Sequence, residues 1–222
     1  MDFSKPKIVA SLTSELEEKA EEARKKGADA VEVRIDLYNG DIEDIRDISL
    51  PVIVTNRPEW EGGEFTGEEK DRIHELEKAM QYADAVDIEL EAEEFHEEIL
   101  RKAEKEKVKV IVSSHDFEKT PEKRKMVETL EYAGSIGDVA KIAVKAEKPD
   151  DSLKLLEAAE EADVKIAAMA MGEPGSYTRI VSPVHGSKIT YASLGEKTAP
   201  GQLSVEEVAE AWRMLNIREE KE

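Results

Sequence analysis

A strand, a helix and a second strand are predicted within residues 108–145, VKVIVSSHDFEKTPEKRKMVETLEYAGSIGDVAKIAVK. A short run rich in β-branched residues stands near each end of this stretch, and a longer, charged and amphipathic segment separates the two runs. Parallel strands need a crossover of about this length, which is usually helical. The stretch is therefore typical of a βαβ unit in a parallel sheet.

The same alternation extends in both directions through the whole chain. The first helix is expected after a cap at Thr13 or Ser14 and ends at Gly27, and the last begins behind Ser204. Residues 172–187 show no clear helical pattern, so we expect a long loop there, of the kind that covers active sites. The strands are expected at about 7–11, 29–36, 51–56, 84–90, 108–114, 138–144, 164–170 and 188–193.

Eight strand–helix repeats fit either a closed barrel or an open doubly wound sheet. A nucleotide-binding doubly wound sheet has a Gly-x-Gly-x-x-Gly or Gly-x-x-x-x-Gly-Lys loop after its first strand, and neither motif stands there in this chain. We therefore predict an α/β fold of the (β/α)8, or TIM barrel, type. A length of 222 residues suits one such domain, which we expect to cover residues 1–217, followed by an acidic tail at 218–222.

Composition excludes several classes of protein. The absence of cysteine rules out disulfides, thiolate metal sites and a cysteine nucleophile. A net charge of -20 repels nucleic acid phosphates and anionic membrane surfaces, so an anionic substrate would need cations inside its site. The acidity fits a solvated helical surface or adaptation to salt or heat. The apolar runs are too short to cross a bilayer and residues 1–12 lack a signal peptide's apolar region, so we expect a cytoplasmic protein.

Several predicted strands place charged side chains on the face opposite their apolar residues. Because strand side chains alternate between faces, Glu32, Arg34 and Asp36 are expected to point into the barrel while their apolar neighbours face the helices. Asp87 and Glu89 repeat this pattern in the fourth strand. Burying such charges is costly without partners, so they indicate either structural ion pairs or a polar site.

Cationic side chains and a histidine gather at the same end of the predicted barrel. Lys141 and Lys145 share the inward face of the sixth strand, while Arg57 ends the third strand and His115 ends the fifth. Catalytic residues of TIM barrels lie at the carboxyl ends of the strands. Each position alone fits a structural ion pair at least equally well, but their convergence favours a catalytic site.

These side chains suit imine chemistry on a small anionic ketone. Burial lowers the pKa of an amine, so a buried lysine can attack a ketone and form a Schiff base. A histidine can remove a proton from the adjacent carbon and return it to a leaving hydroxyl, while arginines clamp a carboxylate. The pattern predicts a lyase or an aldolase, and it does not choose between Lys141 and Lys145.

Five short segments carry a further signal. They are EVRID at 32–36, Arg57 with EGGE at 61–64, SSHDF at 113–117, KIAV at 141–144 and TAPGQ at 198–202. Each is weak alone, but together, in this order and spacing, they resemble the motifs of the type I 3-dehydroquinate dehydratases. The resemblance extends over nearly every segment from Lys7 to Leu215.

The resemblance implies a lyase that dehydrates 3-dehydroquinate to 3-dehydroshikimate, the third step of the shikimate route, without a metal or organic cofactor. It assigns the Schiff base to Lys141 and the general acid and base to His115, oriented by Glu61. Members of this family are often dimers, which leaves a homodimer open. The residues that the resemblance implies for substrate binding are Ser11, Glu32, Arg34, Arg57, Arg179, Thr198 and Gln202.

The chain departs from the family pattern in two places, and two other functions compete. The family more often has serine where this chain has Thr198, and the segment before Arg179 is bulkier than usual. A class I aldolase or transaldolase shares the lysine but needs a phosphate site, for which residues 172–175 are the candidate. The other alternative is a barrel that binds a small acid without catalysis or serves as an acidic scaffold.

Overall fold

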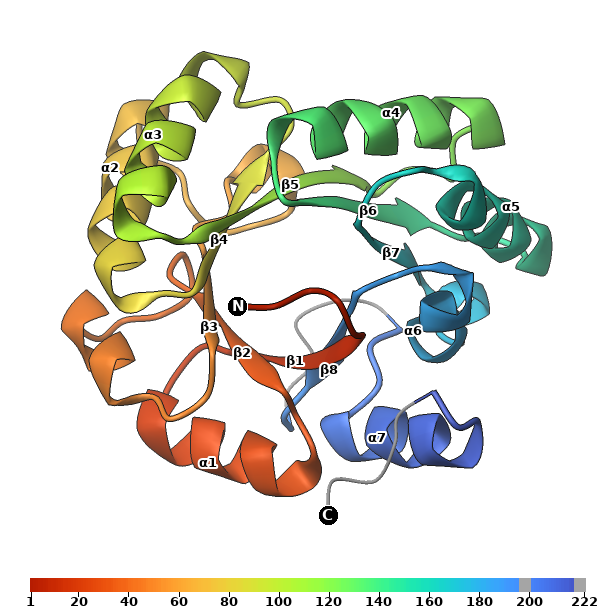
Figure 1. Ribbon diagram of the computed structural model, residues 1–222, viewed down its shortest axis with the longest axis horizontal. Helices are drawn as coiled ribbons and strands as arrows, with labels where there is room; N and C mark the ends of the chain where they lie inside the picture. Colours follow the sequence, from red (N-terminus) through yellow and green to blue (C-terminus); the bar gives the residue numbers. More distant parts are fainter. Residues whose placement is uncertain (196–200, 218–222) are drawn as a thin grey trace.

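Eight parallel strands form the centre of the computed structural model, which describes residues 1–195 and 201–217. Strands that follow each other in the chain lie side by side in the sheet, in the order β7-β6-β5-β4-β3-β2-β1-β8. Helices surround them in Figure 1, which confirms the predicted (β/α)8 barrel. The strands are β1 (Lys7–Leu12), β2 (Ala30–Arg34), β3 (Val52–Thr55), β4 (Ala85–Glu89), β5 (Lys109–Asp116), β6 (Val139–Lys145), β7 (Ile166–Met171) and β8 (Ile189–Ser193).

The helices form the outer layer of the barrel. Between β2 and β3 the described chain forms the 3-10 helix η1 (Ile42–Asp47) in place of an α-helix. None of the helices in the described ranges is long and apolar enough to cross a membrane. The α-helices are α1 (Leu16–Lys26), α2 (Glu69–Ala79), α3 (His96–Glu106), α4 (Lys123–Ile136), α5 (Pro149–Glu161), α6 (Thr178–Val181) and α7 (Val205–Met214).

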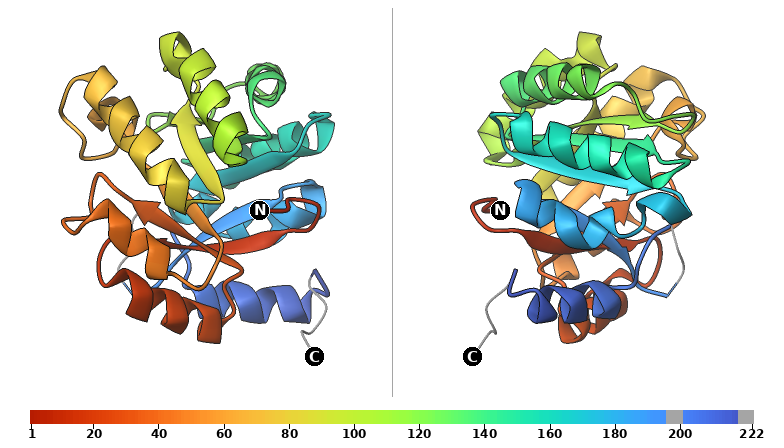
Figure 2. Two further views of the ribbon diagram at one scale, coloured as in Figure 1. Left: turned by 60° about the vertical axis from the view of Figure 1, so that its left-hand side comes forward. Right: turned by 90° about the vertical axis from the view of Figure 1, so that its right-hand side faces the viewer.

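The last helix closes the outer layer against the first. Figure 2 shows α7 beside α1, and an ion pair of 3.6 Å between Lys26 and Glu206 links them. Trp212 of α7 is fully buried in the core between strands and helices, and its indole N–H donates to the carbonyl of Ile180 at 3.0 Å. The helix thereby ties the carboxyl end of the described chain to both α1 and the segment that holds α6.

Few backbone contacts join β7 to β8, where the ring of strands closes. An isolated parallel bridge pairs Ile166 with Ser187. Further along β7, the N–H of Ala168 donates to the Ser187 hydroxyl at 3.1 Å, and the N–H of Ala170 donates to the Thr178 hydroxyl at 2.9 Å. Side-chain hydroxyls therefore satisfy amides of β7 that would otherwise be left unpaired in a buried place.

The barrel interior is apolar at one end and polar at the other. Phe3, from the segment before β1, is 3% exposed and belongs to the apolar end, and the N-terminus lies over the barrel in Figure 1. The other apolar residues include Val9, Ala30, Ile53, Ala85, Ile111 and Val139. Two positions further along these six strands, the buried residue is polar: Ser11, Glu32, Thr55, Asp87, Ser113 and Lys141, the polar set.

Three local predictions can be compared with the structure. Ser204 caps α7 as expected, because its hydroxyl accepts from the N–H of Glu207 at 3.2 Å. The predicted cap of α1 was wrong: Glu15, with a φ of 48°, precedes the helix without a side-chain cap bond. The expected loop at 172–187 was also wrong, because it contains α6 and two single-turn 3-10 helices, each too short to produce an amphipathic repeat.

Candidate active site

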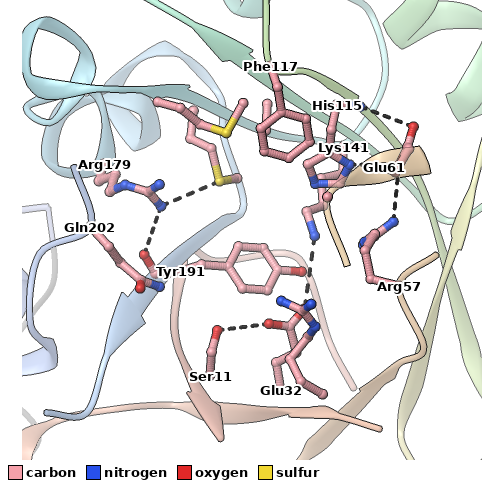
Figure 3. Close-up of a pocket in the computed structure, with 15 residues that line it drawn as sticks. Ser11, Glu32, Arg57, Glu61, His115, Phe117, Lys141, Arg179, Tyr191 and Gln202 are labelled. Atoms are coloured by element: carbon pink, nitrogen blue, oxygen red, sulfur yellow. Dashed lines mark hydrogen bonds and ion pairs between the residues drawn. The ribbon is translucent and has the colours of Figure 1, made fainter. Parts of the chain in front are cut away.

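A cavity of about 170 Å³ opens at the carboxyl ends of the strands (Figure 3). Of the ten residues predicted for the site, nine line this cavity, and Thr198 lies outside the described residues. The nine are Ser11, Glu32, Arg34, Arg57, Glu61, His115, Lys141, Arg179 and Gln202. The cavity is also lined by Gly62, Phe117, Ala143, Met169, Met171 and Tyr191, none of which was predicted.

Lys141 is the lysine that β6 carries into the cavity. It is 5% exposed, and its Nζ lies 2.8 Å from the Asp87 carboxylate and 4.0 Å from that of Glu32. Lys145 is four residues further along the strand, with a side chain that is 45% exposed and an ion pair of 3.6 Å to Glu147. The alternation of strand faces could not separate the two lysines, whereas their depth in the barrel does.

Arg57 holds together a group of buried carboxylates around that lysine. Its guanidinium donates to Asp87 at 2.8 Å and also pairs with Glu61 at 3.3 Å and with Glu89. Burial alone would raise the pKa of Asp87, but the charges of Arg57 and Lys141 outweigh it and hold that pKa well below its usual range. Asp87 therefore stays ionised as the counter-ion of Lys141.

His115 lies near the carboxyl end of β5, beside Glu61. Its Nδ1 lies 2.8 Å from the Glu61 carboxylate, and its backbone N–H donates to the same group at 3.3 Å. Phe117 stacks on the imidazole with ring centroids 6.0 Å apart. Burial, and next the positive charges of Arg57 and Lys141, hold the pKa of His115 well below its usual range. The imidazole is therefore neutral near pH 7, and Nε2 can accept a proton whenever the Glu61 carboxylate accepts from Nδ1–H.

The turn after β3 fixes the position of Glu61. This residue ends a short 3-10 helix, and Gly62 follows it with a φ of 74°, a conformation that favours glycine. A Cβ at Gly63 would lie 2.0 Å from the Arg57 carbonyl oxygen, so only glycine fits there. Burial raises the pKa of Glu61 to about 8, although Arg57 opposes the shift. The carboxyl group thus titrates in the range where enzymes work.

Arg179 is a buried cation without a carboxylate partner among the described residues. It is 1% exposed, and its Nη1 donates to the backbone carbonyl of Tyr191 at 3.1 Å and contacts the sulfur of Met169 at 3.6 Å. Its Nε has no hydrogen-bond partner in the described chain, and burial lowers its pKa to about 10. Such a guanidinium suits an incoming anion, since a carboxylate would supply the missing partner.

The remaining polar wall is held by side-chain hydrogen bonds. The Ser11 hydroxyl donates to Glu32 at 2.8 Å, and Thr55 donates to the other oxygen of the same carboxylate at 2.9 Å. Arg34 forms a two-point ion pair with Asp36, at 2.8 and 2.6 Å. These contacts fix the orientation of groups that can bind hydroxyls of a small polar ligand.

Sequence reasoning missed that Asp87 pairs with Lys141 and that Tyr191 lines the cavity. The inward direction of Asp87 was predicted from alternation in β4, but nothing in the sequence identified Lys141 as its partner. Tyr191 lies in a predicted strand, where an aromatic residue is more often part of the core. No group of three or more histidine, aspartate or glutamate side chains in the described ranges could hold a metal ion.

The sequence profile of the Type I 3-dehydroquinase family matches residues 7–219. The chain belongs to this family. Relatives called 3-dehydroquinate dehydratase include one from Methanococcoides burtonii, 41% identical over 95% of this chain and 95% of its own. Another, from Methanocella arvoryzae, is 40% identical over 98% of this chain and 100% of its own. The resemblance inferred from the five motifs is thereby confirmed.

Solved structures of the same family share the barrel. The 3-dehydroquinate dehydratase of Geobacillus kaustophilus is 31% identical with a TM-score of 0.87, over 98% of this chain and 93% of that one. The Aquifex aeolicus protein is also 31% identical, with a TM-score of 0.84, over 93% of this chain and 97% of that one. A 3-hexulose-6-phosphate synthase, 16% identical with a TM-score of 0.61, shares the fold alone.

Proposed function

We propose that this family member dehydrates 3-dehydroquinate to 3-dehydroshikimate through a Schiff base on Lys141. The observation that carries the proposal is the cavity itself, which is lined by a buried lysine, a neutral imidazole and a guanidinium that has no carboxylate partner among the described residues. The relatives are called 3-dehydroquinate dehydratase, which suggests the reaction, and the side chains of the cavity suggest how it could proceed. Neither a metal nor an organic cofactor is needed for the steps below.

The reaction begins at the amine of Lys141. Once a proton leaves the ammonium, Nζ bonds to the ketone carbon of the substrate, and the carbonyl oxygen departs as water. The product is a protonated imine, whose positive charge draws electrons from the neighbouring carbon. Asp87, 2.8 Å from Nζ, is the counter-ion of this charge before and after the bond forms.

Elimination then needs a base and an acid on the adjacent carbons. Nδ1 of His115 is engaged with Glu61, so Nε2 is the nitrogen that takes the proton next to the imine. The resulting enamine expels the hydroxyl group, which leaves as water with the proton that His115 returns. Water finally hydrolyses the imine and frees Lys141, so the net change is the loss of one water molecule.

Substrate binding is proposed for the rest of the wall. Arg179 would bind the carboxylate, because it is the cavity arginine without a carboxylate partner in the described chain. Arg34, Glu32 and Ser11 would bind ring hydroxyls, and Gln202, which lies beside Arg179 in Figure 3, would bind the substrate on that side. Arg57 is already engaged with carboxylates, so we assign it first to holding Asp87 and Glu61 in place. The aldolase alternative is weakened, because residues 172–175 do not line the cavity.

Turnover and trapping of the imine test the proposal together. Adding 3-dehydroquinate should increase the ultraviolet absorbance of the conjugated product, and borohydride should trap an adduct that peptide mass mapping places on Lys141. K141M should lose both signals, whereas K145M is the matched control and should keep them. H115A should still form the trapped adduct while turnover falls roughly 100- to 10,000-fold. An adduct on Lys145, or no turnover in the wild-type protein, would contradict the proposal.

A further inference from the structure

Tyr191 has a buried hydroxyl group that forms no hydrogen bond with any described residue. The side chain comes from β8 and is 4% exposed, and it lines the same cavity as Lys141. Its Oη lacks a hydrogen-bond partner among the described residues. A buried hydroxyl without a partner costs free energy, and a phenylalanine would fill the same space without that cost. Packing within the protein therefore does not explain why this residue has a hydroxyl group.

The ring of Tyr191 lies against the reacting nitrogen. Nζ of Lys141 is 4.2 Å from the ring centroid, which is the geometry of a cation–π contact. The backbone carbonyl of the same residue accepts a hydrogen bond from Arg179. Figure 3 shows the ring between Arg179 on one side and Lys141 on the other, with the hydroxyl directed toward the side where Lys141 and Glu32 lie.

We propose that Tyr191 is a catalytic residue, with separate tasks for its ring and its hydroxyl group. The ring stabilises the positive charge on the Lys141 nitrogen when the protonated imine forms, and the hydroxyl donates a hydrogen bond to a hydroxyl oxygen of the bound substrate. This inference rests on the proposed Schiff-base reaction, because the ring acts on the nitrogen that carries the imine.

The ring matters more to the imine than to the free lysine. An ammonium group has three N–H donors and can satisfy both Asp87 and Glu32, whereas a protonated imine keeps a single N–H. The imine therefore has fewer N–H donors for these two carboxylates than the ammonium has, and the face of Tyr191 compensates for part of that loss. An interaction that is stronger in the intermediate than in the resting state raises kcat.

The Tyr191 hydroxyl keeps its proton and can therefore donate a hydrogen bond. Burial, followed by the negative charges of Glu32 and Asp87, raises the pKa of Tyr191 well above its usual value. The group is therefore a neutral O–H at every working pH and does not add a further negative charge to the cavity. Since Tyr191 lies between the proposed carboxylate site and the imine nitrogen, the body of the substrate would pass beside it.

Two substitutions separate the tasks, and Y132F serves as a control because Tyr132 is a half-exposed residue of α4. Y191F keeps the ring, so the adduct on Lys141 should form normally while KM rises roughly 3- to 10-fold. Its Tm should equal or exceed that of the wild-type protein, by roughly 2 to 4 °C, because a buried unpaired hydroxyl is gone. Y191L should reduce both kcat and the rate of borohydride trapping, roughly tenfold.

The outcomes show separately whether the Schiff-base reaction fails or only the role proposed for Tyr191 fails. Absence of any adduct in the wild-type protein would overturn the Schiff base and Tyr191's role together. An adduct in the wild type with unchanged KM in Y191F and unchanged trapping in Y191L would overturn the role of Tyr191 alone. A Y191F protein with a lower Tm and an unchanged KM would show a structural hydroxyl and would also overturn the inference.

Discussion

His115 and Glu61 form a pair in which, in the proposed reaction, the location of one proton decides activity. Below the pKa of about 8, Glu61 is a carboxylic acid whose O–H donates to Nδ1, so Nε2 bears the ring proton and cannot accept another. Above that pKa the carboxylate accepts Nδ1–H, and Nε2 offers a lone pair. The active form of the free enzyme therefore increases as the pH rises.

This proton sets a pH dependence that can be measured. We predict that kcat/KM rises through about pH 8 and then levels off, as Glu61 loses its proton. E61Q should lower kcat/KM roughly 10- to 100-fold and remove the rise, because an amide oxygen accepts Nδ1–H at every pH. A rise that persists unchanged in E61Q would assign the titration to another group.

Individual site residues were predictable from the sequence only in part. Their inward direction follows from alternation, and the family motifs selected Lys141. The sequence could not show that Lys145 ends at the rim while Lys141 is buried, because that difference depends on where the barrel ends. The pairing of Lys141 with Asp87 joins β6 to β4 across the interior, and no local pattern encodes a contact across a closed sheet.

At the level of elements, strands were easier to predict than the short helices. Most strands contain several β-branched or small apolar residues, and the signal of a strand is complete within a few positions. α6 spans four residues, so it cannot show the repeat by which a helix is recognised. This single turn carries Arg179, which lines the cavity and which the family resemblance indicated although no helical pattern did.

Thr178 anchors that turn to β7. Its buried hydroxyl accepts from the N–H of Ala170 and donates to the carbonyl of Gly175 at 2.7 Å. We predict that T178V, which keeps the shape, lowers the free energy of unfolding by about 1 to 3 kcal/mol, since two buried backbone groups lose their partner. KM should also rise, because Arg179 is the next residue.

Urea unfolding and steady-state kinetics measure these two effects. T129V is the matched control, because the Thr129 hydroxyl on α4 bonds a helix carbonyl far from the cavity. It should change the free energy of unfolding by less than about 0.5 kcal/mol and leave KM unchanged. Equal values for T178V and T129V would show that the α6 anchor has no role in holding Arg179.

At the level of the whole molecule, the net charge of -20 opposes the binding of an anionic substrate. The cations that attract it, among them Arg34, Lys141 and Arg179, lie inside the cavity, where added salt screens them less than it screens the surface acids. We predict that kcat/KM increases several-fold between about 10 and 100 mM salt, over which the Debye length falls from about 30 to 10 Å.

Sodium and potassium chloride should give the same salt curve, because the expected effect is screening rather than binding of a specific ion. Thermal unfolding at each salt concentration provides the control for changes in folding. A kcat/KM that falls steadily with salt would mean that the cavity cations dominate the field that the substrate meets, despite the net charge of -20.

The barrel interior is divided into an apolar layer, which contributes packing, and a polar layer, which holds the lysine proposed for the reaction. The apolar end, sealed by Phe3, contributes only Tyr191 of the described residues to the proposed reaction, while the polar set holds both Lys141 and its counter-ion. If Lys141 forms the Schiff base as proposed, an engineer who seeks to accommodate a different ketone would change the cavity residues around this amine and keep Phe3 and the apolar residues packed with it.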